Sequence, residues 1–163
     1  MSTLAELIKQ DHFASPAQES MLNVLVTYPW LLGELTAAMA PHDVTPAQYN
    51  VLRILRGRHP EPVTCSYIGE RLLDRTPDVT RLLNRLEKAG LITRKRADYD
   101  RRVVEVAVTE VGLERLEELE GPVEAATRRL TSGLSDAEHR QLSALLEKLR
   151  CNAETAAPSA ARC

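Results

Sequence analysis

The chain has 163 residues, of which 44% are hydrophobic and 27% charged, and its formal net charge is −2. This composition fits one globular domain with a sizeable core and excludes a disordered or fibrous protein. No apolar run approaches the roughly 20 residues that cross a bilayer, and the first residues lack the basic-then-apolar order of a secretory signal. A cytoplasmic protein is therefore expected.

Two helix starts are marked by repeated capping motifs. The segments SPAQ (15–18) and TPAQ (45–48) each place Ser or Thr at the N-cap, Pro at the first helical position and Gln at the third, where its amide can reach back to the cap. The first helix is expected over 15–40, with a kink or a break near residues 25–29, because Pro29 removes one backbone donor. The second is expected to run from Thr45 to about Arg58.

A short helix is predicted after Thr64, with Ile68, Leu72 and Leu73 facing inward.

The next helix is expected to begin with Thr76 as its cap and Pro77 at its first position. It is expected to end at Ala89, because Gly90 supplies a left-handed residue there.

Alternating valines then predict a β-hairpin of two strands, 92–97 and 103–109, with its tip at 98–102. An acidic helix follows from 113 to about 130, and Gly121-Pro122 is expected to bend it.

The last helix is predicted to open with the capping box formed by Ser135 and Glu138. The residues after it, 152–163, are expected to form a flexible tail.

The order short helix, turn, longer helix and hairpin is that of a winged helix-turn-helix, here expected over 45–112. The fold class is therefore mainly α with a small β-hairpin. Residues 71–102 carry ten Lys or Arg against five Asp or Glu, whereas 105–120 carry six Glu against one Arg. Such a basic block suits a surface that meets phosphate, while the acidic block keeps the remainder soluble.

The exposed side of the longer helix mixes short side chains with donors that suit base edges and phosphates. The residues expected to contact DNA from this helix and its approach are Arg75, Thr76, Pro77, Asp78, Thr80, Arg81, Asn84, Arg85 and Lys88. The alternative is an ordinary solvated face of an amphipathic helix.

The hairpin, or wing, offers a second set of DNA contacts: Arg96, Asp98, Asp100, Arg101 and Arg102. Guanidinium groups on a projecting loop suit the negative potential of a narrow minor groove. The two aspartates are expected to orient Arg101 and Arg102 through charge-assisted hydrogen bonds. A polar turn with compensating charges is the alternative.

The chain resembles the multiple-antibiotic-resistance regulator (MarR) family of bacterial transcription factors. The resemblance rests on a spaced set of residues: Arg81, Leu86-Glu87, Gly90-Leu91-Ile92, then seven residues to Asp100-Arg101-Arg102, then six to Thr109, and Gly112. The order of helices extends it over about 15–150. Asp78 and Val79 depart from the pattern, because the family prefers small residues there. An acid at Asp78 could read a cytosine amine or complement the helix N-terminus.

The resemblance implies a homodimeric repressor in which helices 15–40 and 113–151 pack across a two-fold axis. The whole chain, 1–163, would then form a single domain of this family. A two-fold dimer would place its recognition helices about 34 Å apart on a pseudo-palindromic operator. The family's common mechanism is release of DNA when a small phenolic or anionic effector, or an oxidant, changes the spacing of the two halves.

Four aromatic or histidine residues and one cysteine are candidate sensors of an effector or an oxidant. Tyr28, Trp30, His42 and Tyr49 could line an effector pocket, or they could be core or interface residues. Cys65 begins a helix, where backbone donors favour oxidation of a thiol, and structural burial is the alternative.

The remaining residue types argue against other chemistry. Three cysteines without a CxxC pair predict free thiols, and the four histidines lack paired ligand spacing, so neither a metal nor another cofactor is expected. No nucleophile elbow or phosphate-binding glycine loop indicates an enzyme. Two alternatives stay open: a winged-helix protein-interaction module without DNA binding, and a thiol-based redox-responsive regulator of the same fold.

Overall fold

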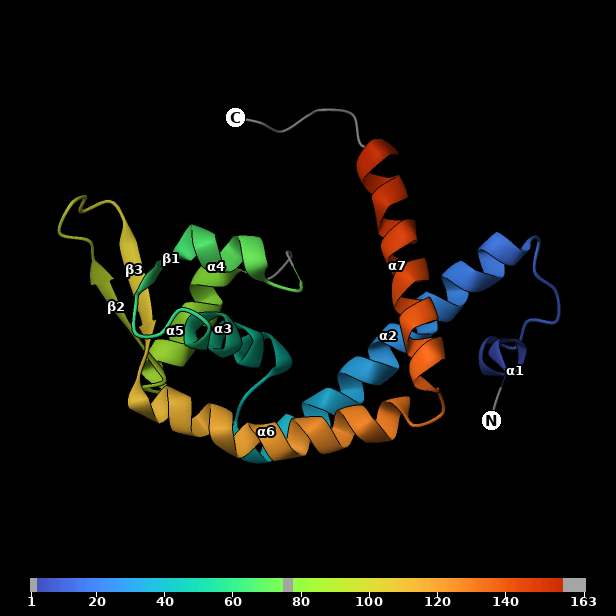
Figure 1. Ribbon diagram of the computed structural model, residues 1–163, viewed down its shortest axis with the longest axis horizontal. Coiled ribbons are helices and arrows are strands. Elements are labelled where there is room, and N and C mark those ends of the chain that lie inside the picture. Colours follow the sequence, from blue (N-terminus) through green and yellow to red (C-terminus); the bar gives the residue numbers. More distant parts are fainter. Residues whose placement is uncertain (1–2, 75–77, 157–163) are drawn as a thin grey trace. The chain divides into compact units, whose positions relative to one another are not determined.

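A computed structural model describes residues 3–74 and 78–156, with side chains as far as Cys151. Helices dominate it, and they are accompanied by one small antiparallel sheet (Figure 1). The elements are, in chain order, α1 (Leu4–Ile8), α2 (Pro16–Met39), the 3-10 helix η1 (Ala40–His42), α3 (Pro46–Arg56), β1 (Val63–Thr64), α4 (Cys65–Arg71), α5 (Val79–Lys88), β2 (Ile92–Arg96), β3 (Val104–Val108), α6 (Glu110–Thr131) and α7 (Asp136–Ala156). The expected fold class, mainly α with a winged helix-turn-helix, is confirmed.

The sheet has three strands in the order β1-β3-β2, so the expectation of a two-stranded hairpin was incomplete. The hairpin register runs from Ile92 opposite Val108 to Arg96 opposite Val104. On its other edge, β3 pairs Val106 with Val63 of β1. Strand β1 is only two residues long, which is too short for an alternating pattern to reveal.

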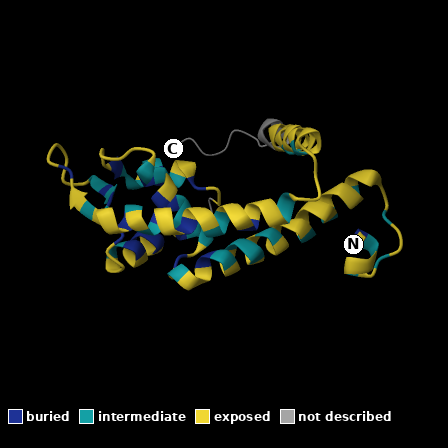
Figure 2. Ribbon diagram, turned by 60° about the horizontal axis from the view of Figure 1, so that its bottom comes forward, coloured by how far each residue is buried: buried dark blue, intermediate teal, exposed yellow. Residues whose placement is uncertain are grey.

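The core lies where α3, α4 and α5 meet one face of this sheet and the first half of α6. Figure 2 shows the buried residues gathered in this part of the chain. The fully buried members come from every one of these elements: Leu52, Ile68, Leu83, Leu86, Ile92, Val106, Leu116 and Leu119. Burial of these side chains fixes the helix-turn-helix against its wing.

The capping motifs act largely as predicted. Thr45 and Gln48 form a complete capping box, in which each backbone N–H donates to the other side chain. Ser135 and Glu138 do the same at the start of α7. At α2, Ser15 accepts from the N–H of Gln18 as expected, but the Gln18 side chain accepts from Ala14 and not from the cap itself.

Helix α2 runs unbroken through Pro29, so the possible break there is wrong, because a proline inside a long helix removes only one backbone donor. Helix α6 likewise continues through Pro122, and the bends expected at Pro29 and at Gly121-Pro122 stay predictions. One expected helix end was also wrong. Helix α7 continues past Cys151 to Ala156, since the Ala and Glu residues there have high helix propensity.

Leu73 was expected to face inward, but it lies beyond the end of α4 and is 91% exposed. Helix α4 ends at Arg71, so its apolar face is completed by Ile68 and by the following residue Leu72. The backbone N–H of Leu73 donates to Asn50 at 2.9 Å, which turns the chain away from the core.

A close junction joins the end of α5 to the start of α6. Thr109 donates its hydroxyl proton to the carbonyl of Gly90 (2.8 Å), and its Oγ1 accepts from the N–H of Gly112 (3.0 Å). A Cβ atom on Gly112 would lie 2.2 Å from the carbonyl oxygen of Leu91, so only glycine allows this approach.

Internal contacts divide the structure into two compact units, with the boundary after Ala126. The winged helix-turn-helix lies wholly in the first unit. The single domain expected for the whole chain stays a prediction. In the ranges 3–74 and 78–156, no helix is both long enough and apolar enough to cross a membrane.

Candidate nucleic-acid interface

Helix α5 presents one apolar face to the core and one polar face to solvent. Leu82, Leu83 and Leu86 are buried at a spacing of three and four residues, which places them on one side of the helix. The predicted DNA-contacting residues of this segment that the structure describes are all exposed: Asp78, Thr80, Arg81, Asn84, Arg85 and Lys88. One helix face therefore gathers two guanidinium groups, an ammonium group and an amide.

The start of α5 differs from the expectation. The helix begins at Val79 and its N-cap is Asp78, whose carboxylate accepts from the N–H of Arg81 at 3.1 Å. This contact supports the interpretation of Asp78 as a partner of the helix N-terminus. The other expected contacts, at 75–77, lie outside the described residues.

A hollow of about 270 Å³ opens at the first turns of α5. It is lined by Asp78, Arg81, Leu82 and Arg85. Arg81 and Arg85 are one helical turn apart and therefore lie on the same side of the helix. Their two guanidinium groups flank a recess that an electronegative group could enter.

The wing carries the second predicted set. Arg96, Asp98, Asp100, Arg101 and Arg102 are all exposed around the turn that connects β2 to β3. The loop is closed by a bond from the N–H of Ala97 to the carbonyl of Val103 (3.0 Å). Ala97 is itself buried, which anchors the base of the loop.

The aspartates of the wing do not have the contacts that were expected. Asp100 accepts from the backbone N–H of Arg102 at 2.9 Å, so it shapes the turn and does not hold a guanidinium group. Neither Asp98 nor Asp100 forms an ion pair with Arg101 or Arg102 in the described part of the chain. The two arginine side chains project from the tip without such a restraint.

Sequence reasoning missed Arg94 of β2. Its Nε donates to Glu87 Oε2 at 2.9 Å, a terminal nitrogen donates to the same oxygen, and that nitrogen also donates to Asn84 Oδ1 at 2.7 Å. These hydrogen bonds lower the pKa of Glu87 and raise that of Arg94. The signal was present in the sequence, because strand alternation puts Arg94 on the same side as Ile92, facing the helix.

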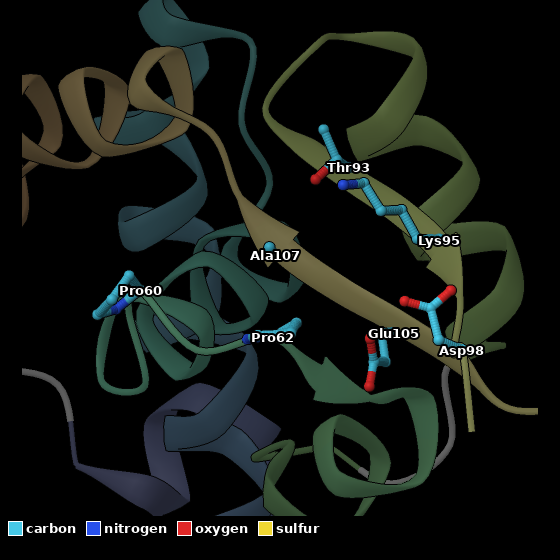
Figure 3. Close-up of a pocket in the computed structure, with 7 residues that line it drawn as sticks. All are labelled: Pro60, Pro62, Thr93, Lys95, Asp98, Glu105 and Ala107. Carbon is cyan, nitrogen blue, oxygen red and sulfur yellow. The ribbon is translucent and has the colours of Figure 1, made fainter. Parts of the chain in front are cut away.

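The other side of the sheet is hollowed (Figure 3). This hollow of about 330 Å³ is lined by Pro60, Pro62, Thr93, Lys95, Asp98, Glu105 and Ala107. Thr93 and Lys95 alternate with Arg94, so their side chains lie on the face of the sheet away from α5.

The four effector-pocket candidates line neither of these hollows. Tyr28 and Trp30 are both exposed on α2, and two residues along a helix turn by about 200°, so they point to nearly opposite sides. Tyr49 lies under Arg53, with the guanidinium carbon 5.8 Å from the ring centroid. His42 lies 3.4 Å from Glu118 of α6. The effector pocket stays a prediction.

Cys65 is the first residue of α4 and is half-buried, with Sγ 3.9 Å from the carbonyl of Val104. It packs against the core and is a free thiol. A redox role for Cys65 stays a prediction.

Comparison with known proteins agrees with this geometry. A family model described as the MarR family matches residues 42–103. The HTH-type transcriptional repressor MdtR of Bacillus subtilis is 34% identical over 122 residues, which cover 75% of this chain and 77% of MdtR.

Solved structures share the fold. A MarR transcription factor from Planctomyces limnophilus has a TM-score of 0.66 at 38% identity, covering 83% of this chain and 98% of that chain. A mutant MarR of E. coli, solved in complex with operator DNA, has a TM-score of 0.70 at 27% identity, covering 77% and 89%. The winged helix-turn-helix seen in the structure is the fold of these relatives. The chain therefore belongs to the MarR family of transcriptional regulators, not to a family of enzymes.

Proposed function

We propose that this regulator is a homodimeric repressor that binds a pseudo-palindromic operator. The observation that carries the proposal is the joint exposure of two cationic groups of residues in one winged unit. Arg81, Arg85 and Lys88 lie on the polar face of α5, and Arg101 and Arg102 lie at the tip of the wing. A helix and a loop of this kind suit neighbouring grooves of duplex DNA.

Each group of residues has its own physical role in the proposal. Helix α5 would enter the major groove, where Arg and Asn side chains can donate to base edges. The wing would approach the minor groove, where Arg101 and Arg102 meet the negative potential of the phosphates. Contacts of the first kind select a sequence, whereas contacts of the second kind mainly add affinity.

The names of two similar proteins support the repressor role. MdtR is named a transcriptional repressor, and the E. coli MarR structure was solved with operator DNA. A cytoplasmic location follows from the proposal, because the operator would be reached there.

The homodimer is supported by apolar side chains exposed on two helices. On α2, Met21, Leu25, Tyr28 and Leu32 form one stripe at helical spacing. On α7, Leu142, Leu145 and Leu149 form another. Contiguous apolar stripes of this kind are typical of surfaces that bury against a partner. A second copy of the chain would cover both, and its symmetry would match a two-fold operator.

Selection of fragments from the source organism's genomic DNA, followed by fluorescence anisotropy titration, tests the proposal. The wild type should bind a recurring inverted repeat, with an affinity that falls steeply as salt rises, because each neutralised phosphate releases counterions. The double variant Arg81→Ala/Arg85→Ala should lose this binding, and Arg140→Ala on α7 serves as a control for the loss of an exposed arginine outside the winged unit. Binding that ignores both salt and the double variant would refute the proposal.

A further inference from the structure

Arg94 occupies an unusual position for a charged side chain. It is paired in register with Val106, which is fully buried, and it shares a face of the sheet with Ile92. Its side chain is only 23% exposed. A guanidinium group held this close to a core requires partners, and α5 supplies them.

The contact between Arg94 and Asn84 fixes the orientation of the Asn84 amide. A guanidinium group can donate hydrogen bonds but cannot accept them, and the same is true of the amide nitrogen of asparagine. The atom that lies 2.7 Å from the Arg94 nitrogen must therefore be the amide oxygen. The oxygen is turned toward strand β2, and the amide nitrogen is directed away from it.

This orientation matters for base recognition. Asparagine reads adenine in the major groove with both ends of its amide, accepting from N6 and donating to N7. In this chain the amide oxygen is turned toward β2, and one of its two lone pairs accepts from a cation whose other bonds, to Glu87, hold it in place. The exposed amide of Asn84 thus offers donors to a ligand, and donors suit the acceptors of guanine or the O4 of thymine.

We propose that Arg94 is a positioning residue that sets the base preference of this regulator by holding Asn84 as a hydrogen-bond donor, so that Asn84 contacts guanine or thymine and not adenine. This inference rests on the proposed function, because it assumes that α5 lies in the major groove. It assigns to Arg94, a residue that need not touch DNA, a share in sequence selection.

The experiment is selection from a randomised duplex library with purified full-length protein, followed by sequencing. The variants are Asn84→Ala, Arg94→Ala and Arg94→Lys. Arg94→Lys keeps a positive charge opposite Glu87 but lacks the planar fork that bonds both partners at once. Lys95→Ala is the matched control, since Lys95 lies on the opposite face of the same strand. Far-UV circular dichroism checks that each variant is folded.

We expect Asn84→Ala to erase the preference at one position per half-site, and the wild type to select guanine or thymine there. Both Arg94 variants should shift that same position toward adenine by about five-fold or more, because the freed amide can then pair with both adenine groups. Lys95→Ala should leave the preference unchanged.

Three results would overturn the inference while leaving DNA binding intact. They are adenine at the Asn84-dependent position in the wild type, no position that depends on Asn84, or Arg94 variants whose base preferences match the wild type. If the wild type selects no sequence at all, the proposed function fails and this inference fails with it, so the two failures are distinguishable.

Discussion

Two nitrogens of Arg94 in β2 converge on a single carboxylate oxygen of Glu87 in α5. The pair joins strand β2 of the wing to α5, the helix that carries the cationic face. It lies at the edge of the core, where both side chains are partly exposed. Charge-assisted hydrogen bonds of this kind are shorter and stronger than hydrogen bonds between neutral groups. The relative placement of helix and wing therefore depends on one ion pair as well as on apolar packing.

This pair should make stability depend on pH in the acid range. Its bonds lower the pKa of Glu87 below the ordinary 4.5, so the unfolded state binds the proton more readily. The stabilisation is present above the ordinary pKa and is lost as the pH falls through the lowered value. Protonated glutamate resembles glutamine, so the urea unfolding midpoints of wild type and Glu87→Gln should differ at neutral pH and converge as the pH falls below 4.5 and through the lowered pKa.

Glu117→Gln is the control for that measurement, because Glu117 is exposed on α6. The difference in urea unfolding midpoint between Glu117→Gln and the wild type should not decrease in the same way as the pH falls. A Glu87→Gln curve that runs parallel to the wild type at every pH would contradict the prediction.

Gly112→Ala should destabilise the protein by about 3 kcal/mol, near the upper end of typical overpacking costs. The new methyl group would collide with the Leu91 carbonyl and with Val108, and backbone cannot move aside as a flexible side chain can. Gly121→Ala, in the same helix, meets nothing within 4 Å and should instead stabilise by about 0.5 to 1 kcal/mol. Chemical denaturation of both variants measures the contrast, and equal effects would refute the steric argument.

Arg102→Ala and Arg81→Ala should weaken DNA binding in different ways. Loss of the wing arginine should lower affinity across many sequences and reduce the salt dependence. Loss of Arg81 should change base preference, by about 1 to 3 kcal/mol for a lost base contact. Titration against a panel of duplexes separates the two, with Arg140→Ala as a control. Curves identical to wild type for both variants would contradict the assignment of these residues to the interface.

Leu25→Glu on α2 and Leu145→Glu on α7 should each shift the protein from dimer to monomer. Both leucines are more than half exposed in the single chain, and a buried carboxylate at an interface is costly. Leu73 is also exposed but lies on neither helix, so Leu73→Glu should leave the molar mass of the particle in solution at that of the dimer. Light scattering coupled to size exclusion measures this, and a wild type that is already monomeric would refute the proposed dimer.

Local signals in the sequence predicted much of the fold. The capping boxes at Thr45 and Ser135 were correct because a cap depends on residues only three positions apart. Gly90 was correctly expected to end α5, and its φ of 72° is one that glycine adopts without strain. The exposed polar side of α5 was also predicted correctly, because it depends only on helical spacing.

Features that depend on distant residues could not be predicted in this way. Strand β1 exists because Val63 meets Val106, a partner far along the chain. The partners of Arg94 lie in another element, so strand alternation could place its side chain on the inward face but could not identify Glu87 and Asn84 as the groups that it bonds. Leu73 is apolar, yet its exposure is set by where α4 ends and by the hydrogen bond that its backbone N–H donates to Asn50.

The last ladder pair of the wing, Arg96 with Val104, lies before the turn begins, and the bond between Ala97 and Val103 closes the loop beyond it. The length of the tip therefore does not affect the register of the two strands. Residues could be gained or lost between these two points during evolution without disturbing the sheet or the helices beneath it. A lineage could lengthen or shorten the reach of its arginines toward the duplex while inheriting the same recognition helix, and so retune affinity separately from sequence choice.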